Sequence, residues 1–151
     1  MKLRAHLCFG GTCEAAFRFY QQVLGGELVT LLRYGDSPLA EQTPAPMRSK
    51  ILHASLVLGS QELLGVDVAP EEHRPPAGYF VLVNLDDPVR AKDVFAALSA
   101  GGEIRMPFQP TFWSPGFGVL VDRFGIPWEV NCESAVTPNR PESPGDSTLA
   151  P

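Results

Sequence analysis

The chain carries one pattern twice, and this repeat limits the folds that it can adopt. Residues 19–28, FYQQVLGGEL, correspond to residues 95–104, FAALSAGGEI. Each segment ends a helical stretch with Gly-Gly, and a glutamate and an aliphatic residue then open a strand. The patterns around both segments predict one strand, one helix and three further strands. We therefore expect an α+β protein made of two β-α-β-β-β modules.

In the first module, alternating apolar residues predict strands at residues 3–9, 27–34, 50–58 and 62–68. A helix after the first of these strands is expected to begin at Thr12, whose hydroxyl can cap it, and to end at Gly25. Residues 35–49 and 69–77 contain several prolines, which predict two loops.

In the second module, strands are predicted at residues 78–85, 103–106, 119–121 and 126–132. The helix is expected to begin at residues 86–88, DDP, because proline suits a first helical turn. Its apolar stripe is predicted to contain Val89, Val94, Phe95 and Leu98. Residues 108–115 are predicted to form a loop.

The last two strands are predicted to form a hairpin with two different faces. Asp122 and Gly125 are typical of the first and fourth positions of a tight turn. In the strand that follows, Trp128 and its alternate neighbours are expected to lie in the core, whereas Glu129 and Asn131 point the other way. Since one helix covers one side of a four-stranded sheet, the other side should face a cleft or a partner.

Composition indicates one globular domain at residues 1–133, with modules at about residues 1–69 and 77–133. Residues 134–151 are rich in Pro, Ser and Thr, which predicts a disordered tail. The net charge of -5 argues against nucleic acid and anionic membranes as partners. No apolar run reaches the length of a membrane span, and no signal-peptide pattern is present, so we expect a cytoplasmic protein.

The D-x-x-G turn followed by W-x-x-N, together with residues 7–17, LCFGGTCEAAF, carries a family resemblance over residues 3–133. These motifs resemble the vicinal-oxygen-chelate superfamily, which includes glyoxalase I, extradiol dioxygenases and bleomycin-resistance proteins. The chain is most similar to its PhnB-like branch. The resemblance implies a curved mixed sheet around a cleft, and it implies dimers.

The resemblance also implies four metal-ligand positions, on the first and fourth strands of each module. Glu129 matches the last of them. The first position falls on Ala5, one residue from His6, and the other two hold apolar residues near Leu64 and at Phe80. His6 and Glu129 are therefore an incomplete candidate set for a divalent metal, and no cofactor is certain. The alternative is that Glu129 marks a former metal position that no longer binds a metal and is solvated in an open cleft.

Other residues are candidates for binding or catalysis without a metal. His53 can act as a general acid or base, as can Glu129, although a lone histidine is more often structural. Substrate-binding candidates are His6, Asn131 and an aromatic cluster over the cleft. The cluster contains Phe112, Trp113 and Phe117, with Phe108 as a further member. The cluster equally fits a dimer contact.

Three functions stay open on the sequence alone. The first is binding of a small molecule in the cleft between the modules. The second is a divalent-metal-dependent lyase or dioxygenase of glyoxalase type, and the third is a structural or partner-binding dimer. A homodimer is expected because strand edges and large apolar loop residues need cover. Whether the protein is an enzyme stays open.

Overall fold

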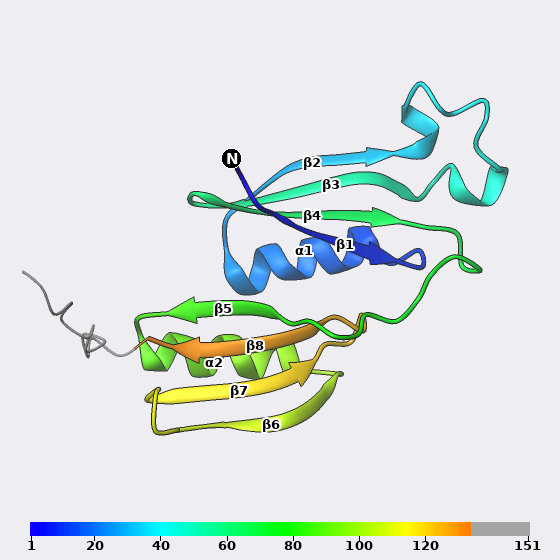
Figure 1. Ribbon diagram of the computed structural model, residues 1–151. Helices are drawn as coiled ribbons and strands as arrows, with labels where there is room; N and C mark the ends of the chain where they lie inside the picture. Colours follow the sequence, from blue (N-terminus) through cyan, green and yellow to red (C-terminus); the bar gives the residue numbers. More distant parts are fainter. Residues whose placement is uncertain (134–151) are drawn as a thin grey trace, which may run out of the picture.

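The computed structural model describes residues 1–133 (Figure 1). The predicted disordered tail at residues 134–151 lies outside the described residues. No helix within residues 1–133 has both the length and the apolar character that a membrane crossing requires.

The first module contains one helix and four strands, as predicted. Strand β1 spans Ala5–Phe9, helix α1 Cys13–Leu24, strand β2 Glu27–Arg33, strand β3 Ile51–Leu58 and strand β4 Gln61–Asp67. They form a four-stranded sheet in the order β1-β4-β3-β2, in which β1 pairs with β4 in parallel. The predicted loop after β2 contains two short 3₁₀ helices, Tyr34–Asp36 and Ala45–Met47.

The second module repeats this topology. Strand β5 spans Val81–Leu85, helix α2 Pro88–Ser99, strand β6 Glu103–Gln109, strand β7 Gly116–Val121 and strand β8 Pro127–Cys132. The order β5-β8-β7-β6, with β5 and β8 parallel, matches that of the first module. Even the hydrogen bond just beyond the parallel pair recurs, from Val68 N to Phe9 O and from Glu133 N to Leu85 O. The predicted duplication is therefore present in the fold.

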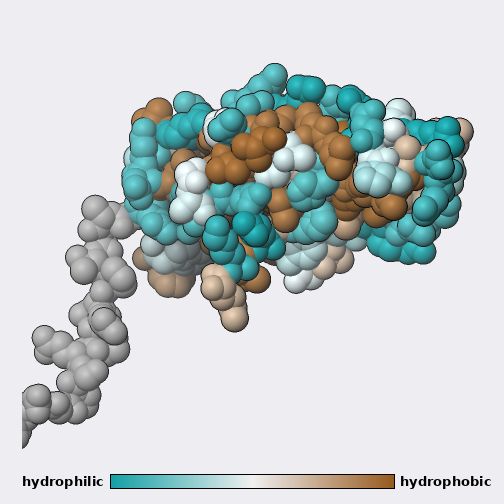
Figure 2. All heavy atoms as spheres, turned by 90° about the horizontal axis from the view of Figure 1, so that it is seen from above, coloured by the Kyte–Doolittle hydropathy of each residue, from teal (hydrophilic) through white to brown (hydrophobic). Residues whose placement is uncertain are grey.

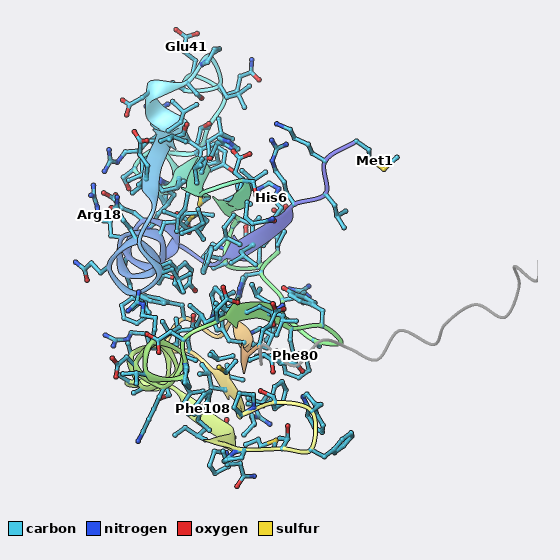
Figure 3. All side chains as sticks on the ribbon, turned by 90° about the vertical axis from the view of Figure 1, so that its left-hand side faces the viewer. Met1, His6, Arg18, Glu41, Phe80 and Phe108 are labelled. Atoms are coloured by element: carbon cyan, nitrogen blue, oxygen red, sulfur yellow. The ribbon has the colours of Figure 1, made fainter. Side chains whose placement is uncertain are left out.

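The two helices lie on one side of the sheets, and we call the opposite side of each sheet its open face (Figure 3). The helix-facing side holds a continuous core that includes Leu7, Phe17, Phe95 and Trp128. Gly65 lets α1 approach β4, because a Cβ there would lie 2.3 Å from the Phe17 ring. Within residues 1–133, one layer of helices thus leaves both open faces without helical cover.

A buried carboxylate joins the two modules. Asp122 Oδ2 accepts hydrogen bonds from Tyr20 Oη of α1 at 2.6 Å and from Trp128 Nε1 of β8 at 2.9 Å. Its Oδ1 accepts from the backbone N–H groups of Phe124 and Ile126, which fixes the predicted tight turn. Since Tyr20, Asp122 and Trp128 are almost inaccessible to solvent, these bonds form in a dry environment.

Several local predictions are wrong for identifiable physical reasons. The Thr12 side chain does not cap α1; Asp67 Oδ1 instead accepts from Gly11 N and Cys13 N. Val89 is 68% exposed, because the buried stripe of α2 is Ala91, Val94, Phe95 and Leu98 and Val89 lies outside that period.

The predicted loop at residues 108–115 starts too early, because β6 continues to Gln109. Phe108 packs on Phe95 with ring centroids 5.6 Å apart, and it occupies the space above Gly116. It therefore belongs to the core side of the sheet and not to the exposed aromatic cluster.

Candidate functional site

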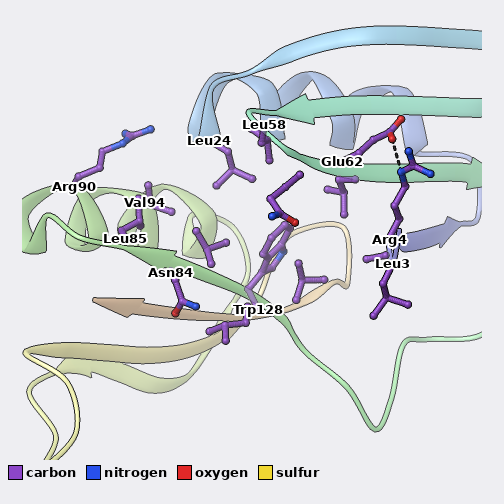
Figure 4. A pocket seen from close by; sticks show the side chains of 16 residues that line it. Leu3, Arg4, Leu24, Leu58, Glu62, Asn84, Leu85, Arg90, Val94 and Trp128 are labelled. Carbon is purple, nitrogen blue, oxygen red and sulfur yellow. Dashed lines mark ion pairs between the residues drawn. The ribbon is translucent and has the colours of Figure 1, made fainter. Parts of the chain in front are cut away.

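A pocket of about 600 Å³ lies between the two modules, and we call it the seam pocket (Figure 4). The start of β1, the end of β3 and the start of β4 form one wall, and β5 forms the opposite wall. The ends of α1 and α2 that meet here also contribute. The lining residues are Leu3, Arg4, Ala5, Leu24, Leu58, Gln61, Glu62, Leu63, Val81, Leu82, Val83, Asn84, Leu85, Arg90, Val94 and Trp128.

The topology explains why a pocket forms at this place. β1 and β5 each end the strand order of their own sheet. No strand fills the gap between these two edge strands within residues 1–133. Side chains of the neighbouring segments line this gap, and the space that they leave is the pocket. The lower part of the pocket is apolar, with Leu58, Val83 and Trp128 among its walls, and polar side chains lie at its rim.

The polar rim has two charged parts. At the β1 end, Arg4 pairs with Glu62, which also accepts a hydrogen bond from Ser55 Oγ at 2.6 Å. The hydrogen bond from Ser55, with the charge of Arg4, lowers the pKa of the Glu62 carboxyl. At the α2 end, Arg90 Nη2 donates to the backbone oxygen of Val23, near the end of α1, at 2.5 Å.

The open face of the first sheet brings together two of the predicted residues. His6 on β1 is exposed and His53 on β3 is half-buried, and their ring centroids lie 6.4 Å apart. Leu7 and Phe9 face the core, so the alternation of β1 places His6 on the open face, whereas Ala5 shares the side of Leu7. The pairing of β1 with β4 contains no bulge, so the alternation of side chains along β1 is regular and Ala5 and His6 point to opposite faces.

The open face of the second sheet carries the other predicted residues. Glu129 and Asn131 are half-exposed on β8, as expected from the burial of Trp128 and Val130. Asn131 Nδ2 donates to Asn84 Oδ1 at 3.0 Å, and Asn131 Oδ1 is buried without a hydrogen-bond partner in the described structure. Phe117 lies opposite Asn131 on β7.

The exposed aromatic cluster is Phe112, Trp113 and Phe117. Phe112 is 97% exposed and Trp113 51% exposed. The ring centroids of Phe112 and Trp113 are 4.5 Å apart, and those of Trp113 and Phe117 are 5.6 Å apart. The three rings thus form one continuous surface beside β7.

The residues present do not complete the metal centre that the family position pattern implies. The strand pairing sets Leu64 opposite His6 in the first sheet and Leu82 opposite Glu129 in the second. Phe80, which holds the remaining family position, comes just before β5. Leucine cannot donate an electron pair to a metal ion, whereas protein zinc sites use three or four donors. Residues 1–133 contain no cluster of three or more His, Cys, Asp or Glu side chains placed to hold a metal.

The predicted site residues and the seam pocket are distinct. His6, His53, Glu129, Asn131 and the aromatic cluster are absent from the pocket lining. Sequence reasoning missed the rim residues Arg4, Gln61, Asn84 and Arg90, which come from separate segments. A signal for the pocket was available in β5. Val81 and Val83 alternate there like residues of a buried side, although the sequence predicts no strand that would pair with the free edge of β5.

Comparison with known proteins agrees with this architecture. The model of the Glyoxalase/Bleomycin resistance protein/Dioxygenase superfamily matches residues 5–130. Protein YjdN from Escherichia coli (strain K12) is 32% identical over 139 residues, which cover 87% of this chain and 95% of that protein.

Two solved structures are similar over nearly their whole length. Protein PA1353 from Pseudomonas aeruginosa is 41% identical with a TM-score of 0.82, covering 89% of this chain and 98% of that one. A putative 3-demethylubiquinone-9 3-methyltransferase, PhnB protein, from Bacillus cereus is 28% identical with a TM-score of 0.72, covering 87% and 99%. The chain therefore belongs to the glyoxalase/bleomycin resistance protein/dioxygenase superfamily, in its PhnB-like branch.

Proposed function

We propose that this protein binds a small, largely apolar organic molecule in the seam pocket. The observation that carries the proposal is the pocket itself, whose volume of about 600 Å³ lies within the usual range of ligand sites. Its walls are mainly aliphatic, Trp128 contributes an aromatic surface, and a few polar groups at the rim can orient a ligand. This combination is typical of binding sites for small molecules.

The proposal is tested by titration with N-phenyl-1-naphthylamine, a neutral probe that fluoresces in apolar sites. Val83→Phe places a larger side chain in the pocket, and Val119→Phe is the matched control on the open face of the second sheet. We expect the wild type and Val119→Phe to bind the probe alike and Val83→Phe to lose binding. If Val119→Phe loses binding and Val83→Phe keeps it, the ligand lies on the open face and the proposal is wrong.

A second candidate function is metal-assisted chemistry with His6 and Glu129. The observation that favours it is the placement of His6 on the open face, the side that also carries Glu129 in the other sheet. A complete donor set would need residues from a second subunit, because the other two family positions hold apolar residues near Leu64 and at Phe80, and Leu82 lies opposite Glu129. Metal analysis of the purified protein is the test: one divalent ion per chain, lost in Glu129→Ala, supports this function.

His53 and Glu129 remain the proposed acid–base residues if the protein is an enzyme. His6 and His53 then offer polar contacts to a ligand on the open face of the first sheet. Asn131 offers one on the open face of the second sheet, where Phe117 lies opposite it and contacts Trp113 of the aromatic cluster. A purely structural or partner-binding role is the third proposal. This role is supported if none of these variants changes the activity or the ligand binding of the protein.

We also propose a homodimer in the cytoplasm. The exposed large apolar residues include Val29, on the outer edge strand β2, and Phe80, Leu82, Phe112 and Trp113 in the second module. Figure 2 shows apolar side chains gathered in a band across the upper face of the molecule. The three cysteines are free thiols, which suits a reducing compartment. A particle mass near 16.4 kDa in light scattering would contradict the dimer.

A further inference from the structure

We infer that the ligand of the seam pocket carries an anionic head group, a carboxylate on an apolar chain, and that Arg90 binds this head group. This inference rests on the proposed function of the pocket and adds the chemical class of its ligand. It follows from the charges at the rim, from the free donors of one guanidinium group and from the apolar character of the space below it.

The two charged parts of the rim differ in their pairing. The positive charge of Arg4 is already compensated by Glu62. Among residues 1–133, no carboxylate lies within ion-pair distance of Arg90. Asp87 and Asp93 are each three residues from Arg90, but neither forms an ion pair with it or lines the pocket, and Asp87 Oδ1 accepts from Val89 N. At the α2 end of the rim, the guanidinium of Arg90 therefore has no ion-pair partner among residues 1–133.

The guanidinium of Arg90 has donors to spare. One N–H of its Nη2 donates to Val23 O, which leaves other N–H groups of a planar group that has five. This bond holds the side chain at the junction of α1 and α2 at the pocket rim (Figure 4). Arg90 is also in the first turn of α2, where the helix dipole favours a negative charge. Guanidinium binds carboxylate with two parallel hydrogen bonds.

The space next to Arg90 suits an unbranched apolar chain. From the rim the pocket continues past Leu85 and Val94 to Leu58 and Trp128, all of which present apolar surface. A volume of about 600 Å³ is typical of sites that hold drug-sized ligands. A carboxylate with a chain of about ten carbon atoms is a ligand of this size class. A carboxylate at Arg90 and a chain along these walls would satisfy both parts of the pocket at once.

The test uses decanoate and decanol as competitors of N-phenyl-1-naphthylamine at neutral pH. The two compounds share the same chain and differ in head-group charge. Arg90→Gln removes the charge and retains an amide donor that can reach toward Val23 O. Arg123→Gln is the matched control, because Arg123 Nε also donates to the backbone carbonyl of a helix end, that of Ala100, but Arg123 does not line the pocket.

We expect decanoate to displace the probe from the wild type at lower concentration than decanol does. Arg90→Gln should weaken decanoate about fivefold to tenfold, which lies between the effects of an exposed and of a partly desolvated charge pair. Decanol should be unaffected, Arg123→Gln should match the wild type, and Arg90→Lys should recover part of the decanoate affinity. Thermal unfolding of each variant verifies that it is folded.

Equal displacement by both compounds, or equal weakening of both in Arg90→Gln, would overturn the inference while the proposed function stands. Loss of probe binding in Val83→Phe shows independently that the pocket is the site. If the wild type binds neither probe nor competitor, the proposed function fails, and this inference fails with it.

Discussion

Replacing Asp122 by Asn should destabilise the protein strongly, because one carboxylate serves four donors. Oδ2 accepts from Tyr20 Oη at 2.6 Å and Trp128 Nε1 at 2.9 Å, and Oδ1 accepts from two backbone N–H groups of the turn. An Asn side chain has only one acceptor oxygen, so its NH₂ group must face one of these pairs. If the oxygen keeps the turn, the indole N–H of Trp128 is left facing another donor.

The magnitude follows from burial and bond type. Each hydrogen bond to a charged group contributes about 1.5–3 kcal/mol, and an unsatisfied buried donor costs about 1–3 kcal/mol. Trp128 is 1% exposed, so water cannot replace the lost partner. We expect Asp122→Asn to lower the free energy of unfolding by about 3–5 kcal/mol, a large part of the ~5–15 kcal/mol typical of a domain.

The assay is urea unfolding at neutral pH, with two comparison variants. Tyr20→Phe removes one bond and leaves no donor unpaired, so it should cost about 1.5–2 kcal/mol. Asp93→Asn changes an exposed aspartate of α2 and should have almost no effect. An Asp122→Asn cost below that of Tyr20→Phe would refute the idea that this carboxylate joins the modules.

Three further predictions test the faces, the packing and the pH dependence. Trp128→Ala should cost about 3–5 kcal/mol in urea unfolding and Glu129→Ala almost nothing, because only Trp128 is buried in the core; reversed costs would mean an inverted strand. Gly65→Ala should lower the melting temperature, since its Cβ would meet the Phe17 ring, and an unchanged value would contradict the close contact of α1 and β4. Burial and the charge of Asp122 raise the pKa of Tyr20 above its ordinary value of 10.0, so the unfolded chain loses this proton first and the free energy of unfolding should fall as pH rises above about 10; Tyr20→Phe should show a smaller slope, and an equal slope would contradict this assignment.

The fold could be predicted from the sequence because its signals are local. Gly25, Gly101 and the Asp122 turn end elements by backbone geometry, and alternation in β8 identifies the buried side of Trp128. The same local reasoning misplaced Val89 and Phe108. Val89 is apolar but lies outside the buried stripe, and the direction of Phe108 depends on the space above Gly116, which only the packed sheet shows.

The candidate site was less predictable because it depends on how distant segments meet. The alternation of β1 does place His6 on the open face, but its approach to His53 depends on the course of the sheet across β4. The rim of the seam pocket joins the start of β1, the start of β4 and the first turn of α2. No spacing in the sequence reports that two edge strands, β1 and β5, come to lie at one gap.

Trp128 connects the stability of this protein to its proposed function. Its indole N–H bonds Asp122 in the link between the modules, and its side chain is also part of the pocket wall. A ligand at the proposed site would touch both modules, so it would bind only the folded chain and would stabilise it by mass action. Asp122→Asn, which does not remove any lining residue, should therefore weaken ligand binding as well as folding. The buried hydrogen bonds of Asp122 and ligand binding in the pocket would then both depend on the packing of the two modules against each other.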